Sequence, residues 1–98
     1  MIFYFQKLYL EVCRMIKIQT TAYGDENSYQ MSKCASEQKY GNNQEYKEKC
    51  CLAPGTYTLN CKCSYGDGWH GGFIEIDGVV YCKNFMSAPS MTVNVTWT

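Results

Sequence analysis

Apolar and polar residues alternate along several short segments of the chain, a pattern typical of β-strands with one buried face. After the turn residues of "AYGDENSYQMSK", Tyr29 and Met31 alternate with polar neighbours. The same period of two predicts strands in "GTYTLNC" (Tyr57, Leu59, Cys61), "GFIEIDG" (Phe73 and Glu75 against Ile74 and Ile76) and "SMTVNVTW" (Met91, Val93, Val95, Trp97).

Turn residues separate these segments and set the expected fold. Pro54-Gly55 precedes one predicted strand, and Asp77-Gly78 is a typical tight turn of a hairpin that returns through Val79 to Cys82. Residues 35–49 are polar and charged, and they predict a long surface loop with at most a helical turn. The sequence predicts an all-β fold: a disulfide-stapled antiparallel β-sandwich of seven or eight strands, of jelly-roll or CUB-like type.

The first residues are more apolar than the rest. "MIFYFQKLYL" predicts an extension, residues 1–15, attached to a sandwich domain of residues 16–98. Lys7, Glu11 and Arg14 interrupt the apolar run, so neither a secretory signal nor a membrane span is expected, and we predict an ordered part of the mature protein. The extension is either an edge strand of its own domain or a strand donated to a neighbouring copy.

Length and charge limit the classes of partner. The chain has 98 residues, enough for one modest core, and 9 Lys and Arg balance 9 Asp and Glu. No global field therefore favours nucleic acid or an anionic membrane, and neither is an expected partner.

Seven cysteines in so short a chain predict disulfides and an extracellular, oxidising compartment. Zinc sites favour paired C-x-x-C units, whereas Cys50 and Cys51 are adjacent and Cys61 and Cys63 form C-x-C. Cys34 is expected to pair with Cys50 or Cys51. An odd number leaves one thiol free or linked to another chain, and Cys13 pairs either with Cys63 or Cys51 of a neighbour or within its own chain.

A longer pattern adds a resemblance. "YGDENSYQM", then "CLAPGTYTLNCKCSYGDGWHGGFIEIDG" and "YCKNF" resemble a module of secreted and cell-surface microbial proteins, over about residues 16–97. The resemblance implies a CUB-type or jelly-roll sandwich with roles in adhesion, carbohydrate contact or structure. It also implies a Cys61–Cys82 disulfide. Cys63 stands where the motif usually has Asp, and His70 where Asn is common.

The glycine-rich loop, residues 64–72, is expected to be architectural. It lies between two predicted strands and has no Lys, unlike phosphate-binding loops. Glycines permit the chain to reverse while the tryptophan packs into the end of the sandwich. The residues given this role are Gly66, Asp67, Gly68, Trp69, Gly71 and Gly72.

Calcium is the one candidate cofactor, and none is expected to be required. Asp67 is predicted to meet Asp25 or Glu26 from the other acidic turn, because calcium takes carboxylate and carbonyl oxygens. The alternative is that Asp67 caps its own turn.

Catalysis is not expected. His70, the single histidine, lacks a free nucleophile and an orienting group once the cysteines are assigned to disulfides. Tyr23, Tyr40, Tyr46 and Tyr65 are the candidates for exposed rings that stack on sugars. Asn94-Val95-Thr96 is a glycosylation sequon on the outward face of the last predicted strand.

Two functions remain open. The first is an extracellular structural subunit that self-assembles with other copies through its N-terminal strand, with an intersubunit disulfide as a further link. The second is a monomeric module for adhesion that binds calcium or glycans.

Overall fold

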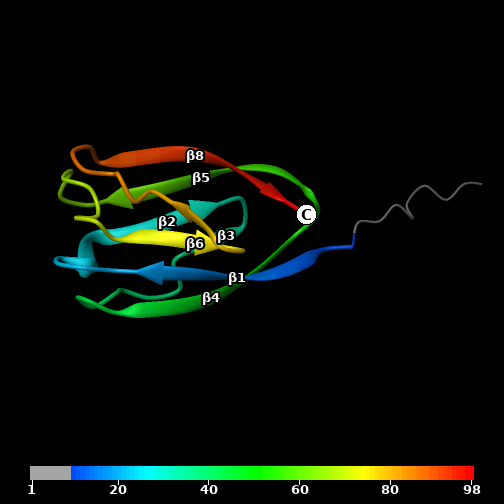
Figure 1. Ribbon diagram of the computed structural model, residues 1–98, viewed down its shortest axis with the longest axis horizontal. Helices are drawn as coiled ribbons and strands as arrows, with labels where there is room; N and C mark the ends of the chain where they lie inside the picture. The colour runs from blue at the N-terminus through cyan, green and yellow to red at the C-terminus, as the bar shows by residue number, and fades with distance from the viewer. Residues whose placement is uncertain (1–9) are drawn as a thin grey trace, which may run out of the picture.

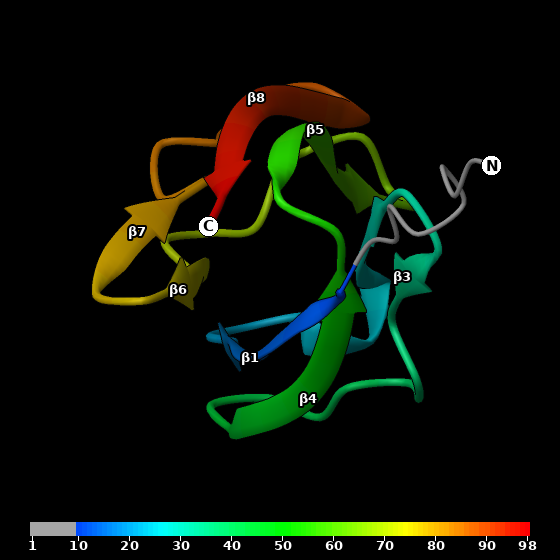
Figure 2. The ribbon, with the colours of Figure 1, turned by 90° about the vertical axis from the view of Figure 1, so that its right-hand side faces the viewer.

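Two four-stranded antiparallel sheets face each other in the computed structural model, which describes residues 10–98 (Figure 1). The sheet order is β4-β1-β6-β7 in one sheet and β3-β2-β5-β8 in the other. Figure 2 shows the two layers with the strands close to end-on. The strands are β1 (Val12–Gln19), β2 (Asn27–Met31), β3 (Cys34–Ala35), β4 (Glu45–Leu52), β5 (Gly55–Cys63), β6 (Phe73–Ile76), β7 (Val79–Tyr81) and β8 (Ser90–Trp97), with a 3-10 turn η2 (Gly24–Glu26) before β2. The predicted all-β, disulfide-stapled sandwich is confirmed.

The core lies between the sheets and follows the alternation in the sequence. In β1, β2, β5, β6 and β8, side chains at alternate positions are more buried than their neighbours, which are at least partly exposed. Asp77 and Gly78 both have positive φ, 54° and 78°, as a two-residue hairpin turn with the twist of its strands requires. The most deeply buried side chains are Ile16, Ile18, Met31, Leu59, Trp69, Ile74, Val95 and Trp97.

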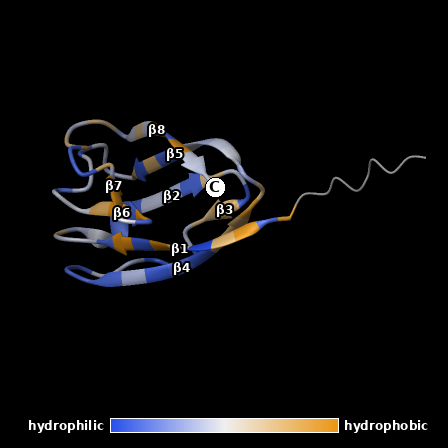
Figure 3. Ribbon diagram, turned by 45° about the vertical axis from the view of Figure 1, so that its right-hand side comes forward, coloured by the Kyte–Doolittle hydropathy of each residue, from blue (hydrophilic) through white to orange (hydrophobic). Residues whose placement is uncertain are grey.

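The prediction of a long loop over residues 35–49 was wrong at its C-terminal end. β4 begins at Glu45 and pairs with β1 over eight positions. Its outward positions are charged, and its inward positions begin with a half-buried Tyr46 and a buried Glu48, so the sequence shows no apolar alternation there. β4 accordingly has a largely hydrophilic colour in Figure 3. Pairing with an apolar neighbour, rather than its own hydrophobicity, makes this segment a strand.

Residues 12–15, expected to belong to the N-terminal extension, form the start of β1. β1 starts at Val12; its residues 12–15 pair with β4 alone, and β6 joins β1 only at residues 17–19, so residues 12–15 already belong to the sheet. The extension of residues 1–15 was expected to be a donated or edge strand, and its residues 1–9 lie outside the described residues.

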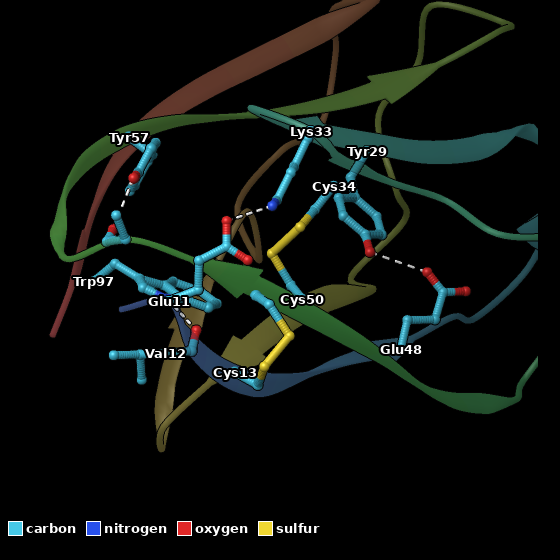
Figure 4. The surroundings of a disulfide bond; sticks show 12 residues. Glu11, Val12, Cys13, Tyr29, Lys33, Cys34, Glu48, Cys50, Tyr57 and Trp97 are labelled. Atoms are coloured by element: carbon cyan, nitrogen blue, oxygen red, sulfur yellow. Dashed lines mark hydrogen bonds and ion pairs between the residues drawn. A yellow bond between two sulfur atoms is a disulfide. The ribbon is translucent and has the colours of Figure 1, made fainter. Parts of the chain in front are cut away.

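Three disulfides join the strands. Cys61–Cys82 and Cys34–Cys50 each link the two sheets or the loops beside them, and Cys13–Cys51 crosses between paired strands of one sheet. The adjacent cysteines serve different faces: Cys50 is buried between the sheets, whereas Cys51 points to the outer face, where Cys13 lies (Figure 4). The Cys61–Cys82 pair agrees with the one that the family resemblance implied.

The structure changes the expected pairing of two cysteines, Cys13 and Cys63. Cys13 pairs within its own chain, so the intersubunit disulfide through Cys13 is replaced by the intrachain alternative. Cys63, expected among the disulfide cysteines, is the free thiol and is buried. The direct opposition of Cys13 and Cys51 in the β1–β4 register is the physical reason, because it places the two side chains on one face.

Glu48 is a buried carboxylate that the sequence did not single out. Its side chain is 2% exposed and accepts hydrogen bonds from the hydroxyls of Tyr29 (3.0 Å) and Tyr40 (3.1 Å). Burial raises the pKa of Glu48, although the two hydroxyls partly oppose that change. Burial, together with the nearby carboxylate, raises the pKa of both tyrosines.

The disulfides indicate an oxidising, extracellular type of environment. Over residues 10–98, we find no helix with the length and apolar character that crossing a membrane requires.

Candidate functional site

The glycine-rich loop and the turn before β2 meet at one end of the sandwich, the left-hand end in Figure 1, opposite the C-terminus. The strand register brings them together, because Asn27, the first residue of β2, pairs with Cys63, the last residue of β5. The amide of Ser64 donates to the carbonyl oxygen of Glu26 at 3.0 Å. Glu26 is therefore held beside the start of the glycine loop.

Trp69 anchors this loop, as the sequence predicts. Its side chain is fully buried, its indole nitrogen donates to the Lys62 carbonyl at 2.8 Å, and its amide donates to the Phe85 carbonyl at 3.0 Å. Gly68 has a φ of 78°, and a Cβ there would overlap the backbone of Phe85. The buried ring of Trp69 and the close approach of Gly68 to the Phe85 backbone therefore fix the conformation of the loop.

Three side chains that can bind metal converge at this end. Ligand atoms of Glu26, Asp67 and His70 all lie within 4.8 Å of one another. Asp67 Oδ2 lies 3.3 Å from His70 Nε2, which makes no well-aligned hydrogen bond with any described residue. His70 adopts a positive φ of 52°, and the hydroxyl of Thr21 donates to its carbonyl at 2.8 Å.

The buried thiol of Cys63 contacts the two carboxylates of this group. Cys63 is 3% exposed, and its Sγ lies 3.2 Å from Asp67 Oδ1 and 3.8 Å from Glu26 Oε1. The cluster of Glu26, Asp67 and His70 therefore has a thiol against its two carboxylates.

The predicted calcium ligands are only partly brought together. Glu26 and Asp67 meet, as expected, whereas Asp25 is exposed and lies outside the group. His70 and Cys63 contribute instead, and both were considered in other roles. Cys63, Asp67 and His70 lie within eight residues of one another, and this spacing was the sequence signal that could have grouped them. Sequence alone did not show that the turn before β2 would complete the group.

A pocket of about 490 Å³ opens above the carboxylates. It is lined by Tyr23, Glu26, Tyr65, Asp67 and His70. The two tyrosines are 55% and 77% exposed, respectively, and the Tyr23 and His70 rings lie 5.1 Å apart. These rings flank polar groups that can accept hydrogen bonds.

Two of the four tyrosines expected on the surface lie elsewhere. Tyr40 is 2% exposed and binds Glu48, so the prediction of an exposed ring was wrong. Tyr46 is half-buried and packs against Tyr40, with the ring centroids 4.7 Å apart. Buried partners, invisible in the local sequence, draw both rings inward.

Whether Cys63 could act as a nucleophile depends on which group contacts its thiol. A cysteine nucleophile is activated by an imidazole that contacts the thiol, with a carboxylate behind the imidazole. Here the carboxylate of Asp67 lies next to both the thiol and the imidazole. This arrangement suits ligand binding better than nucleophilic catalysis.

No family model, curated protein or solved structure matches the chain. The resemblance to the secreted CUB-like module stays a prediction.

Proposed function

We propose that this protein is a secreted, non-catalytic module that binds carbohydrate at the loop end of its sandwich. The observation that carries the proposal is the pocket in which Tyr23 and Tyr65 flank the carboxylates of Glu26 and Asp67.

The pocket has the two kinds of group that sugars need. Aromatic rings pack against the apolar face of a pyranose, and exposed rings do so at little conformational cost. Carboxylate oxygens accept hydrogen bonds from sugar hydroxyls, and such charge-assisted bonds are stronger than neutral ones. A pocket volume of about 490 Å³ falls in the range of small-ligand sites.

The position of the pocket suits a module for adhesion. The C-terminus lies at the opposite end of the molecule, where Arg14 donates to the carbonyl oxygen of Thr98 (Figure 1).

Glycan-array screening followed by calorimetry tests the proposal. We expect Tyr65→Ala to weaken binding of the selected glycan about tenfold, a loss of roughly 1.4 kcal/mol, because the stacking ring is removed. Tyr65→Phe keeps the ring and should bind nearly as the wild type does.

Met86→Ala is the off-site control, since Met86 is 61% exposed and does not line the pocket. Absence of binding to any glycan, or binding that Tyr65→Ala leaves unchanged, would contradict the proposal.

Self-assembly is the second candidate, and β7 is the observation that favours it. β7 ends its sheet, and Val79 and Val80 are 50% and 45% exposed. An exposed apolar edge is a place where a strand from another copy can add, and the apolar residues 1–9 are the candidate donor.

Electron microscopy of the unreduced full chain tests self-assembly. We expect fibres from the wild type and discrete particles from Val80→Lys, because a charge on the edge opposes strand addition. Met86→Lys adds the same charge away from β7 and should still form fibres. Discrete wild-type particles at every concentration would exclude this candidate.

A further inference from the structure

We propose that Cys63, Glu26, Asp67 and His70 together bind one zinc ion at the loop end of the sandwich. The proposal concerns the loops that form the carbohydrate pocket but goes beyond the proposed function. It does not require that the protein bind sugar.

The donor set distinguishes zinc from calcium. Calcium takes six to eight oxygen ligands, whereas zinc accepts thiolate, imidazole and carboxylate in a tetrahedron. Together with Cys63, the cluster supplies one sulfur, one imidazole nitrogen and two carboxylates. Thiol and imidazole donors favour a borderline-soft metal and contribute little to calcium binding.

Three contacts between neighbouring donors approach the spacing around a tetrahedral ion. Metal–ligand bonds of about 2.0–2.3 Å place ligand atoms roughly 3.3–3.8 Å apart. Cys63 Sγ lies 3.2 Å from Asp67 Oδ1 and 3.8 Å from Glu26 Oε1, and His70 Nε2 lies 3.3 Å from Asp67 Oδ2. Ligand atoms of Glu26, Asp67 and His70 lie within 4.8 Å of one another, whereas Cys63 contacts only the two carboxylates and lies outside that group. Zinc binding therefore requires the Cys63 and His70 donors to move closer together, by about 1 Å or more.

Asn27 provides a second, independent observation. It lies directly across from Cys63 in the β2–β5 register, and it is 4% exposed. Neither its side-chain oxygen nor its side-chain nitrogen has a hydrogen-bond partner among the described residues. Buried amides are almost always satisfied, so an unpartnered one beside Cys63 indicates a polar species that the protein itself does not supply.

A bound metal ion would also explain why Cys63 is a buried free thiol. Cys63 is the single cysteine outside the three disulfides, and it is buried against two carboxylates. A thiol in such surroundings gains little as a packing group. On zinc binding, the Cys63 thiol releases its proton to solvent and binds as a thiolate, and the metal offsets the negative charge of the thiolate and the two carboxylates.

Metal titration of the unreduced protein tests the site. We expect zinc to bind with a stoichiometry of one and to raise the melting temperature, and calcium at the same concentration to leave the melting temperature unchanged. Cobalt(II) should give a thiolate-to-metal absorption band. Because the other six cysteines are in disulfides, that band identifies Cys63.

Three variants sharpen the assignment. Cys63→Ser should abolish the cobalt band and weaken zinc binding at least about tenfold, and His70→Asn should weaken zinc binding to a similar degree. Asn tolerates the positive φ of His70 well, so this variant should keep its fold even where Cys63→Ser does not. Asp25→Asn removes a neighbouring carboxylate outside the cluster and should bind zinc as the wild type does.

Each outcome separates this site from the carbohydrate proposal. Zinc binding without glycan binding upholds the site and rejects the proposed function, and the reverse result rejects the site alone. Stabilisation by calcium but not by zinc overturns the inference. Zinc binding that neither Cys63→Ser nor His70→Asn weakens also overturns it.

Discussion

Glu48 shows how much a single buried side chain depends on one or two contacts. Glu48 is charged, yet it is 2% exposed and contacts two tyrosine hydroxyls from other segments. A buried carboxylate is costly unless it is fully hydrogen-bonded, and Tyr29 and Tyr40 supply that bonding. The result is a polar contact between the sheets that depends on pH.

Glu48 should make the free energy of unfolding depend on pH in a defined direction. Because burial raises its pKa in the folded protein, the folded state binds the proton more tightly than the unfolded state. Stability should therefore fall as pH rises from the pKa of the unfolded state, about 4.3, through the raised pKa of the folded state. The loss should be about 1.4 kcal/mol for each pH unit that separates the two pKa values.

Glu48→Gln should remove this part of the pH dependence. Denaturant unfolding of the wild type and of Glu48→Gln measures the free energy of unfolding at each pH. The range of about pH 4 to 8 starts near the unperturbed pKa of glutamate and extends above it. Glu75→Gln is the control, because that carboxylate is only partly buried and is not bonded to tyrosine. Parallel curves for wild type and Glu48→Gln would contradict the assignment.

Gly68 is the residue on which the glycine loop depends most. Gly68→Ala should destabilise the fold by at least about 2 kcal/mol more than Gly66→Ala, because only the first also forces a Cβ into the Phe85 backbone. Both glycines have positive φ, 78° and 82°, so the matched pair separates collision from backbone strain. Equal melting temperatures for the two variants would show that the close approach does not matter.

At the scale of elements, neighbours decide what the local sequence leaves open. β4 is a charged strand held by β1 on one edge and by two disulfides near its end. One adjacent cysteine faces the core and the other the outer surface, because successive side chains of a strand point to opposite faces. The two disulfides of β4 therefore stabilise different layers.

Removal of each disulfide should cost a different amount. Loop closure alone predicts about 3–4 kcal/mol for either Cys13–Cys51 or Cys61–Cys82, whose sequence separations are 38 and 21. Burial reverses the small advantage of the longer loop, because Cys61 and Cys82 are 0% and 3% exposed and Cys13 faces solvent.

We therefore expect Cys61→Ala/Cys82→Ala to lose more free energy of unfolding than Cys13→Ala/Cys51→Ala, by about 1–2 kcal/mol. Urea denaturation of the two double variants measures the difference. A larger loss for the Cys13–Cys51 variant would mean that loop entropy outweighs packing.

The whole molecule presents its two candidate interaction surfaces on different parts of the fold. The pocket lies at the loop end, and the exposed valines lie on the β7 edge. Asn94 is exposed on β8, the edge strand of the other sheet.

Glycosylation of Asn94 is expected when the protein passes through a eukaryotic secretory pathway. Intact mass before and after enzymatic deglycosylation should differ by the mass of one N-glycan. Thr96→Ala destroys the sequon on the same exposed face and should remove the difference. An unchanged wild-type mass would reject the site.

The sequence by itself determined the fold class and most of the strands. Alternation with a period of two selects the buried face wherever inward residues are apolar, as in β2, β5 and β8, and the Asp77-Gly78 turn sets its hairpin locally. Tertiary structure decided the rest. It made a charged segment into β4, drew Tyr40 inward to Glu48, and paired Cys13 with Cys51. It also placed Glu26 beside Cys63, Asp67 and His70, because only strand pairing brings together residues 37 or more positions apart.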